Sequence, residues 1–367
     1  MVEEGLLGRA CKTIGNLLTG RKVFIIADST VWKLWGEKLL RGLKPLKAPV
    51  ILVTPGERFK RLETVEKIAD ELAFHGAERS SLLLVVGGGV TGDMGSFAAA
   101  IYLRGIDYIH IPTTLLAQVD SAIGGKTGVN LGVGKNLVGA FYQPKMVLSD
   151  IQVLRTLPER ELRAGLFESI KCGVIGDPEL FQFLETQRKN ILRGNPESLG
   201  YVIHASAALK GRIVSQDEKE SDLRRVLNFG HTLGHALEAA TNYRRFLHGE
   251  AVAWGMLAAT RLAVNINLLA HTEALRIASL IHSYGPVPSL RSISSSSVVK
   301  HMKVDKKVRD GQIHFVLPEK IGKVRIVSGI SPQQAIRVFE ELQGESPLHT
   351  SGKLSQKTPS SKISRHP

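Results

Sequence analysis

The chain has 367 residues, of which 43% are hydrophobic and 22% are charged. These proportions are close to the globular average, so they exclude wholesale disorder and collagen-like architectures, and the length fits two domains. No uninterrupted apolar stretch reaches the roughly 18 residues that a membrane span requires. Lys and Arg number 48 against 34 Asp and Glu, a net charge of +14, which calls for an anionic partner or a basic tail.

The positive charge favours a small, multiply anionic substrate over nucleic acid. Only 6% of the residues are aromatic, and the basic residues are not interleaved with aromatic ones as they are in nucleic-acid-binding surfaces. Glu3 and Glu4 stand where a secretory signal would carry positive charge. Two cysteines, Cys11 and Cys172, are too few for a disulfide framework. We therefore expect a cytoplasmic protein with no membrane and no nucleic-acid partner.

Residues 1–150 predict an α/β nucleotide-binding domain. Short β-branched runs alternate with helix-period segments such as Glu63–His75, a pattern that favours a parallel sheet with crossover helices. The predicted strands are Lys22–Ala27, Val50–Val53, Leu82–Val86, Tyr108–Ile111 and Met146–Leu148.

Residues 151–345 predict a mostly α-helical domain, because apolar residues recur there at spacings of three and four. The predicted helices are Glu161–Val174, Pro178–Leu192, Leu199–Ser215, Asn228–Ala239, Glu250–Ile266 and Thr272–Tyr284. One late strand pair is expected at His314–Leu317 and Lys323–Ile326. The serine-rich stretch Ser292–Ser297 predicts a loop, and residues 346–367, with four basic and no acidic side chains, predict a disordered basic tail.

An apolar strand runs into a glycine-rich turn at Gly87–Asp93. Gly87, Gly89 and Gly92 have the G-x-G-x-x-G spacing, which lets backbone N–H groups approach a pyrophosphate at a helix N-terminus. A tight strand–helix turn without a ligand would use glycine equally well, and this turn follows the third predicted strand rather than the first. A nucleotide site across the carboxyl ends of the sheet would include Asp28, Glu57, Lys60 and these glycines.

The segment from Pro112 to Asn136 places Asp120, Lys126 and Lys135 among several glycines in an apolar context. A flexible backbone that holds spaced cations suits the recognition of phosphate or carboxylate. The plain alternative is a glycine-rich surface loop with incidental lysines.

Arg224, Asn228, His231 and His235 fall at i, i+4, i+7 and i+11, so on one helix all four would share a face. Such a face is too polar for a core stripe. Its apolar neighbours leave little surface for solvent, which argues against a merely solvated face. We therefore expect a binding face here.

Glu168 lies on an earlier apolar helix and His248 at the start of a later one. An embedded carboxylate needs a partner, because an isolated buried charge is costly. One Glu and two His from separate helices give the three-ligand site that a catalytic zinc-like metal uses. His231 and His235, at i and i+4, could both bind one metal, so spacing alone leaves the choice between them open.

Taken together, these motifs resemble the 3-dehydroquinate synthase family. The matching segments are Gly87–Asp93, Pro112–Thr127, Gly134–Asn136, Glu168–Lys171, Asn228–His235 and His248–Glu250, in family-like order between about Asp28 and Lys307. The resemblance implies a dehydroquinate-synthase-like fold, a homodimer, NAD and one divalent metal, Zn²⁺ or Co²⁺. It implies a shikimate-pathway lyase that turns 3-deoxy-D-arabino-heptulosonate 7-phosphate into 3-dehydroquinate and phosphate by transient oxidation, phosphate elimination, re-reduction and aldol closure.

The resemblance also assigns roles to single residues. It implies Glu168, His231 and His248 as metal ligands, and it leaves His235 to the substrate. For NAD it implies Asp28, Glu57, Lys60, Gly88, Gly89, Val90, Asp93, Thr113, Thr114, Lys135 and Thr156. The implied catalytic residues are Asp120, Lys126, Lys171, Lys210, Arg224, Asn228 and His235, and the implied substrate contacts are Arg104, which would reach the neighbouring subunit, Lys135, Asn136 and Lys306 or Lys307. Departures from the family pattern are Ala164, Phe167, Ser169 and Cys172, none of which removes a charged group.

Three other functions compete with this interpretation. Another sugar-phosphate cyclase would share the fold, NAD and metal, but Arg224 and Lys210 favour recognition of a carboxylate. A glycerol-dehydrogenase-like polyol dehydrogenase would have little use for so many cations. A basic nucleic-acid-binding protein would lose affinity steeply with salt. We expect the synthase, with Arg224 on the substrate carboxylate; a surface ion pair of Arg224 with Asp222 or Glu218 is the alternative.

Overall fold

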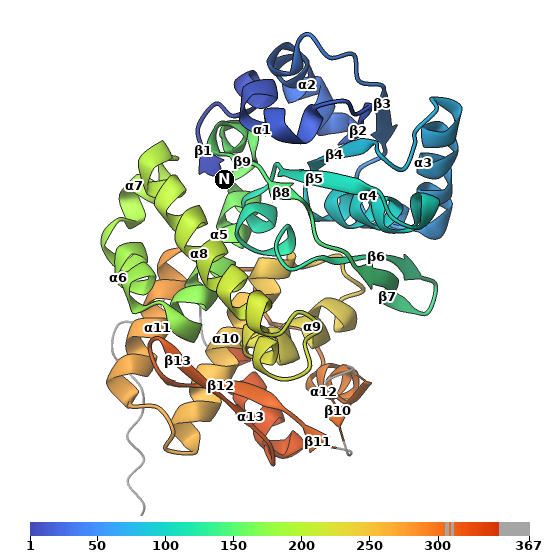
Figure 1. Ribbon diagram of the computed structural model, residues 1–367. Helices are drawn as coiled ribbons and strands as arrows, with labels where there is room; N and C mark the ends of the chain where they lie inside the picture. The colour runs from blue at the N-terminus through green and yellow to red at the C-terminus, as the bar shows by residue number, and fades with distance from the viewer. Residues whose placement is uncertain (305–307, 310–311, 345–367) are drawn as a thin grey trace, which may run out of the picture.

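The computed structural model describes residues 1–304, 308–309 and 312–344 (Figure 1). A parallel sheet with its helices forms the N-terminal half, and a group of helices with a strand hairpin forms the C-terminal half. The predicted fold class is therefore confirmed. The predicted basic tail and the predicted Lys306 and Lys307 contacts lie outside the described residues. Among the described helices, none has the length and apolar character needed to cross a membrane.

The sheet has five strands in the order β3-β2-β4-β5-β8, and every pairing in it is parallel. Because β3 and β4 lie on opposite sides of β2, the order of the strands reverses there, and such a point opens a crevice at the carboxyl ends of the strands. All five predicted strands are present, with ends that differ by at most one residue. Their bounds are β2 Val23–Asp28, β3 Val50–Val53, β4 Leu82–Gly87, β5 Asp107–Pro112 and β8 Met146–Val147.

Both faces of the sheet are buried, which explains why its strands are continuous apolar runs. Phe24 and Ile26 of β2 pack into a core with α3 (Leu62–Phe74) and α4 (Gly89–Ile101). Ile25 and Ala27 point the other way, towards α1 (Ala10–Leu18) and α2 (Ser29–Leu43), into a core that continues through the helical half. One face of the sheet is thus part of the packing that holds the helices.

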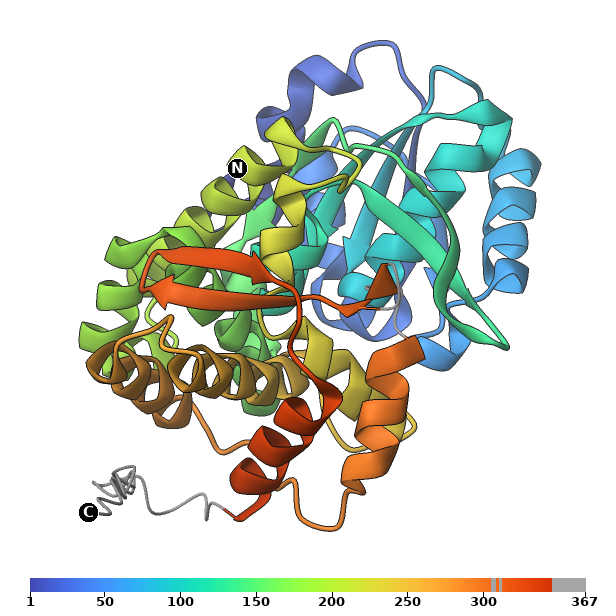
Figure 2. The ribbon, with the colours of Figure 1, turned by 90° about the horizontal axis from the view of Figure 1, so that it is seen from below.

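The predicted helices of the second half are present, although Pro178–Leu192 is divided between two. The observed helices are α5 Glu159–Gly176, α6 Pro178–Thr186, α7 Arg188–Leu192, α8 Pro196–Gln216, α9 His231–Ala240, α10 His248–Asn265, α11 His271–Ser283, α12 Ser295–Val304 and α13 Pro332–Gly344. The predicted strand pair is β12 (Phe315–Lys320) and β13 (Lys323–Val327), an antiparallel hairpin that lies against these helices (Figure 2).

The predicted helix Asn228–Ala239 is wrong at its start. Residues Leu223–Asn228 form a separate 3-10 helix, η6, and α9 begins only at His231. Gly230 interrupts the pattern with a left-handed φ of 79°. A Cβ at Gly230 would lie 2.8 Å from the Val252 carbonyl oxygen of α10, so close packing between the helices requires glycine here. Arg224 and Asn228 therefore do not share one continuous helix face with the histidines.

Two segments for which a loop was considered contain regular structure. The expected loop Ser292–Ser297 already contains the start of α12, where the Ser297 N–H donates to Ser294 Oγ at 3.3 Å, as serine does at helix starts. The plain alternative for Pro112–Asn136, a glycine-rich surface loop, does not hold, because the segment runs into an antiparallel hairpin, β6 (Lys126–Leu131) with β7 (Gly134–Phe141). A Cβ on Gly139 would lie 2.0 Å from the Thr127 carbonyl oxygen, so glycine permits this close strand approach.

Candidate active site

Three helices bring one carboxylate and three imidazoles together in the helical half. Glu168 of α5 is fully buried, and its Oε1 lies 3.8 Å from His231 Nε2 and 3.6 Å from His248 Nε2. His235, one turn after His231 on α9, also belongs to the cluster, because ring nitrogens of the three histidines lie within 4.8 Å of one another. The structure therefore brings together every predicted metal ligand, and it keeps the alternative His231–His235 pair within reach.

These residues fit a divalent metal by their chemistry. Carboxylate oxygen and neutral imidazole nitrogen are zinc-type donors, and Glu168 Oε1 is buried without a hydrogen-bond partner among the described residues. Each predicted histidine ligand uses Nδ1 elsewhere: His231 Nδ1 lies 3.1 Å from the Phe229 carbonyl oxygen, and His248 Nδ1 lies 3.2 Å from Glu238 Oε2. Nε2 of each ring is thus the atom directed at Glu168.

Close glycine contacts fix the three helices relative to one another. A Cβ on Gly249 would lie 1.9 Å from the Ala164 carbonyl oxygen, so the start of α10 meets α5 backbone to backbone. A Cβ on Gly255 would lie 1.7 Å from the Gly230 carbonyl oxygen, so α10 meets the start of α9 in the same way. Arg160 adds a two-pronged contact to Glu250, with N–O distances of 2.6 and 2.7 Å. Glycine and a paired charge therefore set the spacing of the candidate ligands.

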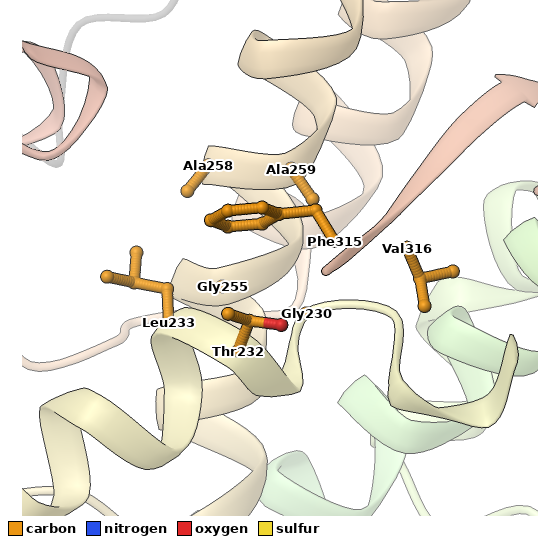
Figure 3. Close-up of a pocket in the computed structure, with 8 residues that line it drawn as sticks. All are labelled: Gly230, Thr232, Leu233, Gly255, Ala258, Ala259, Phe315 and Val316. Carbon is orange, nitrogen blue, oxygen red and sulfur yellow. The ribbon is translucent and has the colours of Figure 1, made fainter. Parts of the chain in front are cut away.

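A small apolar pocket lies behind this junction (Figure 3). The Phe315 ring of β12 extends across Ala258 and Ala259 of α10, and Leu233 of α9 faces it. None of the lining residues carries a charged group, and the lining is mostly apolar. Its lining is Gly230, Thr232, Leu233, Gly255, Ala258, Ala259, Phe315 and Val316.

Two buried lysines converge on Asp120. Lys210 Nζ of α8 donates to Asp120 Oδ1 at 2.9 Å and to its carbonyl oxygen at 2.7 Å, and Lys171 Nζ lies 3.5 Å from Oδ1. Lys171 also forms an ion pair with Glu168. Burial raises the pKa of Asp120, but Lys210 and Lys171 outweigh it and hold this pKa well below its usual range. Asp120 is therefore ionised, and it lies in a short π-helical turn, Ala117–Ser121, a conformation frequent at functional sites.

Arg224 is only 2% exposed, and backbone carbonyls hold its guanidinium. Its Nη1 donates to the Glu218 carbonyl oxygen at 2.6 Å, and its Nη2 donates to the Gly124 carbonyl oxygen at 3.0 Å. The described residues give no ion pair of Arg224 with the carboxylate of Asp222 or Glu218, so the surface ion pair that competed with a binding role is absent from them. These two hydrogen bonds use two of the five N–H donors of the guanidinium group.

Glu220 connects two predicted site residues. Its Oε1 accepts from Asn228 Nδ2 at 3.0 Å, and its Oε2 forms an ion pair with Lys126. Burial raises the pKa of Glu220, but Lys126 and Asn228 outweigh it and lower the pKa overall. Glu220 is not among the predicted site residues, because it lies in a run of charged residues typical of a solvated loop.

The carboxyl edge of the sheet carries the predicted nucleotide residues. Asp28 ends β2 and caps α2 by accepting the Thr30 and Val31 N–H groups. Gly88 and Gly89 start α4, whose first turn has no side-chain cap, so its N–H groups are available to an anion. Close contacts explain the glycines: a Cβ on Gly88 would lie 3.0 Å from Thr114 Cγ2, and one on Gly92 would lie 2.4 Å from the His110 ring.

These residues fit a dinucleotide. The Thr113 hydroxyl, one of the predicted contacts, is buried without a hydrogen-bond partner among the described residues, and so is the Ser121 hydroxyl. Ser121 Oγ would lie 3.0 Å from a Cβ on Gly89. An unpartnered buried hydroxyl beside a glycine-rich helix start suits a polar ligand that passes close to the backbone.

The β6–β7 hairpin extends over the same edge of the sheet. Lys60 Nζ contacts Asp93 and donates to Asn136 Oδ1 at 2.6 Å. Lys135 Nζ lies 3.6 Å from Glu57 Oε1 and 4.0 Å from the centre of the Tyr243 ring. Burial raises the pKa of Asp93, and Lys60 opposes this shift only in part. The structure thus places the predicted lysines of this region beside predicted acids or amides.

Two predicted residues lie apart from these contacts. Arg104 is exposed in a short 3-10 helix, Tyr102–Arg104, with a left-handed φ of 67°. Thr156 accepts the Trp35 indole N–H at 2.9 Å and donates to the Val153 carbonyl oxygen at 3.1 Å. Val90, in the first turn of α4, is half-buried.

Glu238 is a second site residue that the sequence analysis missed. It lies on α9 three residues after His235 and seven after His231, so helix periodicity alone would have placed it on the histidine face. Burial raises the pKa of Glu238, but the neighbouring His248, His235 and Lys135 lower it overall.

The sheet edge has the features of a nucleotide site, and the helical half holds a cluster of carboxylate and imidazole donors. This combination defines the class of two-domain enzymes that use a dinucleotide together with a metal. The family profiles described as 3-dehydroquinate synthase N-terminal and C-terminal match residues 50–164 and 165–308. The 3-dehydroquinate synthase of Solibacter usitatus is 48% identical over 330 residues, 90% of this chain and 92% of that protein. That of Prochlorococcus marinus is 44% identical over 92% of this chain and 95% of that protein. The chain belongs to the 3-dehydroquinate synthase family.

Solved structures agree with this assignment. The 2-epi-5-epi-valiolone synthase of Streptomyces hygroscopicus, with NAD⁺ and Zn²⁺ bound, has a TM-score of 0.85 and 30% identity and covers 93% of this chain and 95% of its own. A 2-deoxy-scyllo-inosose synthase with carbaglucose-6-phosphate, NAD⁺ and Co²⁺ has a TM-score of 0.83 and 27% identity over 93% and 96%. The glycerol dehydrogenase of Schizosaccharomyces pombe, at 17% identity over 93% and 87% and a TM-score of 0.64, shares the fold alone.

Proposed function

We propose that this chain converts 3-deoxy-D-arabino-heptulosonate 7-phosphate into 3-dehydroquinate and phosphate, using NAD and one divalent metal, Zn²⁺ or Co²⁺. Glu168, His231 and His248 are the proposed metal ligands. The observation that carries this proposal is the Glu168 Oε1 atom, buried without a hydrogen-bond partner among the described residues and 3.6 to 3.8 Å from two histidine Nε2 atoms. Lys171 already pairs with this carboxylate through Oε2, and the unpartnered Oε1 is available to a second cation.

When bound, the metal lowers the pKa of a coordinated substrate hydroxyl, and NAD accepts and returns hydride. The protein's own residues do the binding and orientation. Arg224 holds the substrate carboxylate, because a planar guanidinium matches it with two parallel bonds. Lys126, Lys210 and Lys171 supply further positive charge for the anionic substrate, and Asp120 and Glu220 hold them in place. His235 borders the metal ligands and serves the substrate hydroxyls as an acid–base group.

For NAD we propose the carboxyl edge of the sheet. The first-turn N–H groups of α4, after Gly88 and Gly89, bind the pyrophosphate, and Thr113 uses its otherwise unpartnered hydroxyl on the cofactor. The further proposed contacts are Asp28, Glu57, Lys60, Val90, Asp93, Thr114, Lys135 and Thr156. Lys135 and Asn136 of the hairpin also reach the substrate, and Lys306 or Lys307 closes its phosphate end.

We also propose a cytoplasmic homodimer in which Arg104 reaches the partner's site. Both cysteines are free, as a reducing compartment favours. Arg104 is exposed, and Ile101 and Leu103 beside it expose 47% and 40% of their surface, which suits an apolar contact around a projecting cation. Sedimentation equilibrium measures the molecular mass of the protein in solution and so tests for the dimer. A mixture of the inactive Arg104→Ala and His248→Ala chains should regain activity only if sites are shared.

The decisive experiment supplies the heptulosonate phosphate with Zn²⁺ or Co²⁺ and NAD at a small fraction of the substrate concentration, and it follows phosphate release. Turnovers that greatly exceed the NAD supplied are expected, because NAD is regenerated in each cycle. NADH that accumulates up to one equivalent of the NAD supplied, without phosphate release, would indicate a dehydrogenase instead. Glucose 6-phosphate, which lacks a carboxylate, is the comparison substrate: faster phosphate release from it would indicate a different sugar-phosphate cyclase.

A further inference from the structure

Glu238 contacts two residues of the site, and the reaction proposed above gives it no role. It lies near the C-terminal end of α9 and is 7% exposed. Its Oε2 lies 3.2 Å from His248 Nδ1, and its Oε1 lies 3.9 Å from Lys135 Nζ. The contact with His248 is the only one of the two at hydrogen-bond distance, so the imidazole is the main partner of this carboxylate.

The contact determines how His248 can present itself. An ionised carboxylate only accepts hydrogen bonds, so Nδ1 must carry the proton when the pair forms. Nε2 is then the ring nitrogen with a lone pair, and it lies 3.6 Å from Glu168 Oε1. His248 is the first residue of α10, so no preceding helical turn restrains its ring. Glu238 supplies that restraint from a different helix.

The other proposed histidine ligand is held differently. His231 Nδ1 lies 3.1 Å from the Phe229 carbonyl oxygen, a neutral acceptor two residues away in the same chain segment. His248 instead depends on a charged acceptor ten residues away. Charged partners form stronger hydrogen bonds than neutral ones, and a carboxylate also makes the imidazole a more basic ligand.

We propose that Glu238 is a positioning residue that orients the His248 imidazole and fixes its Nδ1–H tautomer, so that Nε2 faces the metal site. This inference rests on the proposed function, in which His248 binds the metal. Glu238 itself touches neither metal nor substrate. Through Lys135 it also connects the metal end of the site with the hairpin over the sheet edge.

The test measures metal affinity rather than turnover. Co²⁺ is titrated into the metal-free protein in the absence of NAD and substrate, and its visible absorption gives the dissociation constant. Glu238→Gln keeps an acceptor of the same size without the charge, and Glu238→Ala removes the acceptor. We expect the dissociation constant to rise about tenfold for Glu238→Gln and up to about a hundredfold for Glu238→Ala, the usual range for a lost outer partner of a histidine ligand. The thermal midpoint of the metal-free Glu238→Gln variant should stay close to that of the parent protein.

Two control variants make the outcome specific. Glu185→Gln removes a carboxylate of α6 that is not part of the cluster and pairs with Arg276 at 2.6 Å, and it should leave Co²⁺ affinity unchanged. Lys135→Met removes the lysine that lies 3.9 Å from Glu238 Oε1, and it should leave Co²⁺ affinity within about twofold because His248 keeps its partner.

Three results would overturn the inference. Affinities of both Glu238 variants within twofold of the parent would show that His248 needs no restraint. A loss as complete as that of Glu168→Gln would make Glu238 a ligand instead of a positioning residue. An equal loss of Co²⁺ affinity in Lys135→Met would show that the lysine, and not the contact between Glu238 and His248, supports metal binding. If His248→Ala leaves Co²⁺ binding intact, His248 is not a metal ligand and the proposed metal site is wrong. This outcome therefore distinguishes a failure of the proposed metal site from a failure of the role of Glu238.

Discussion

The two sides of the site differ in the groups that they offer to a ligand. At the sheet edge, glycines bring the backbone close, and the Thr113 hydroxyl is buried without a hydrogen-bond partner among the described residues. Where the helical half meets the turn that contains Asp120, full charges dominate: the Asp120 carboxylate has two lysines within 3.5 Å, and Lys171 also pairs with buried Glu168.

This difference fits the two ligands of the family's reaction. A dinucleotide that is retained through the cycle can be held by shape and backbone N–H groups. A substrate that carries a carboxylate and a phosphate needs cations, and cations in a buried site need acids or carbonyls to hold them. Variants that remove a charge should therefore damage the helical half most, and variants that alter close packing should act through geometry.

The largest effect is expected for the proposed metal ligands. His248→Ala should lower bound metal to background and reduce kcat/KM by at least about 1000-fold, because the metal supplies several kcal/mol of charge stabilisation. His235→Ala should leave metal content nearly intact, as measured by elemental analysis of the dialysed protein. If His235→Ala removes the metal and His248→Ala does not, the His231–His235 pair on α9 is the ligand set.

Arg224→Lys should come next. The Arg224 N–H donates to Asp217 Oδ2 at 3.0 Å, so the backbone stays in place when the side chain changes. Lysine cannot reproduce the two parallel bonds to a carboxylate, and the loss should be about 2–4 kcal/mol, or roughly 30- to 1000-fold in kcat/KM. An analogue without the carboxylate should show little of this penalty. Equal penalties for both substrates would refute the carboxylate role.

The sequence predicted the sheet half more closely than the helical site. The strands could be located because continuous apolar runs such as Leu82–Val86 are long, local signals. The start of α9 could not be located in this way. Glycine is required at position 230 because the backbone of α10, which is distant in sequence, packs against it. The hairpin was missed for the same reason: Gly128 and Gly139 approach each other's strands only in the folded protein.

The candidate residues show the same limit. Residues within motifs were found, because each motif keeps its chemistry within a few positions. Glu220 was missed because its partners Lys126 and Asn228 lie on other segments. Asn136 was found, but its contact with Lys60 over 76 positions was beyond any pattern in the sequence. Contacts between distant segments require the fold.

A smaller effect is expected from helix spacing. Gly255→Ala places a Cβ 1.7 Å from the Gly230 carbonyl oxygen, so α10 must move away from the start of α9. We expect a loss of about 1–3 kcal/mol in the free energy of unfolding together with weaker Co²⁺ binding, although no ligand has changed. Gly15→Ala on α1 is the matched control. Its Cβ would meet nothing within 4 Å, so it should gain about 0.5–1 kcal/mol and bind metal normally. Unchanged metal affinity in Gly255→Ala would show that this contact does not set the site.

The smallest effect concerns acid stability in the sheet half. His110 of β5 is buried, its Nε2 has no hydrogen-bond partner among the described residues, and burial lowers its pKa to about 4. On acidification the unfolded chain binds this proton near pH 6.5 while the folded chain still excludes it, so stability falls as pH drops from about 6.5 towards 4. Between pH 7.5 and 5.5 the contribution should be about 1 kcal/mol.

Urea unfolding of the parent and of His110→Leu at both pH values isolates this contribution, because all other titrating groups are shared. The quantity compared is the decrease in the free energy of unfolding between pH 7.5 and pH 5.5, not its absolute value. This decrease should be smaller for His110→Leu than for the parent by about 1 kcal/mol. Equal losses would mean that the folded sheet half accommodates the His110 proton. The contrast between the two sides of the site would then not extend into the core beneath Gly92, which packs against this ring.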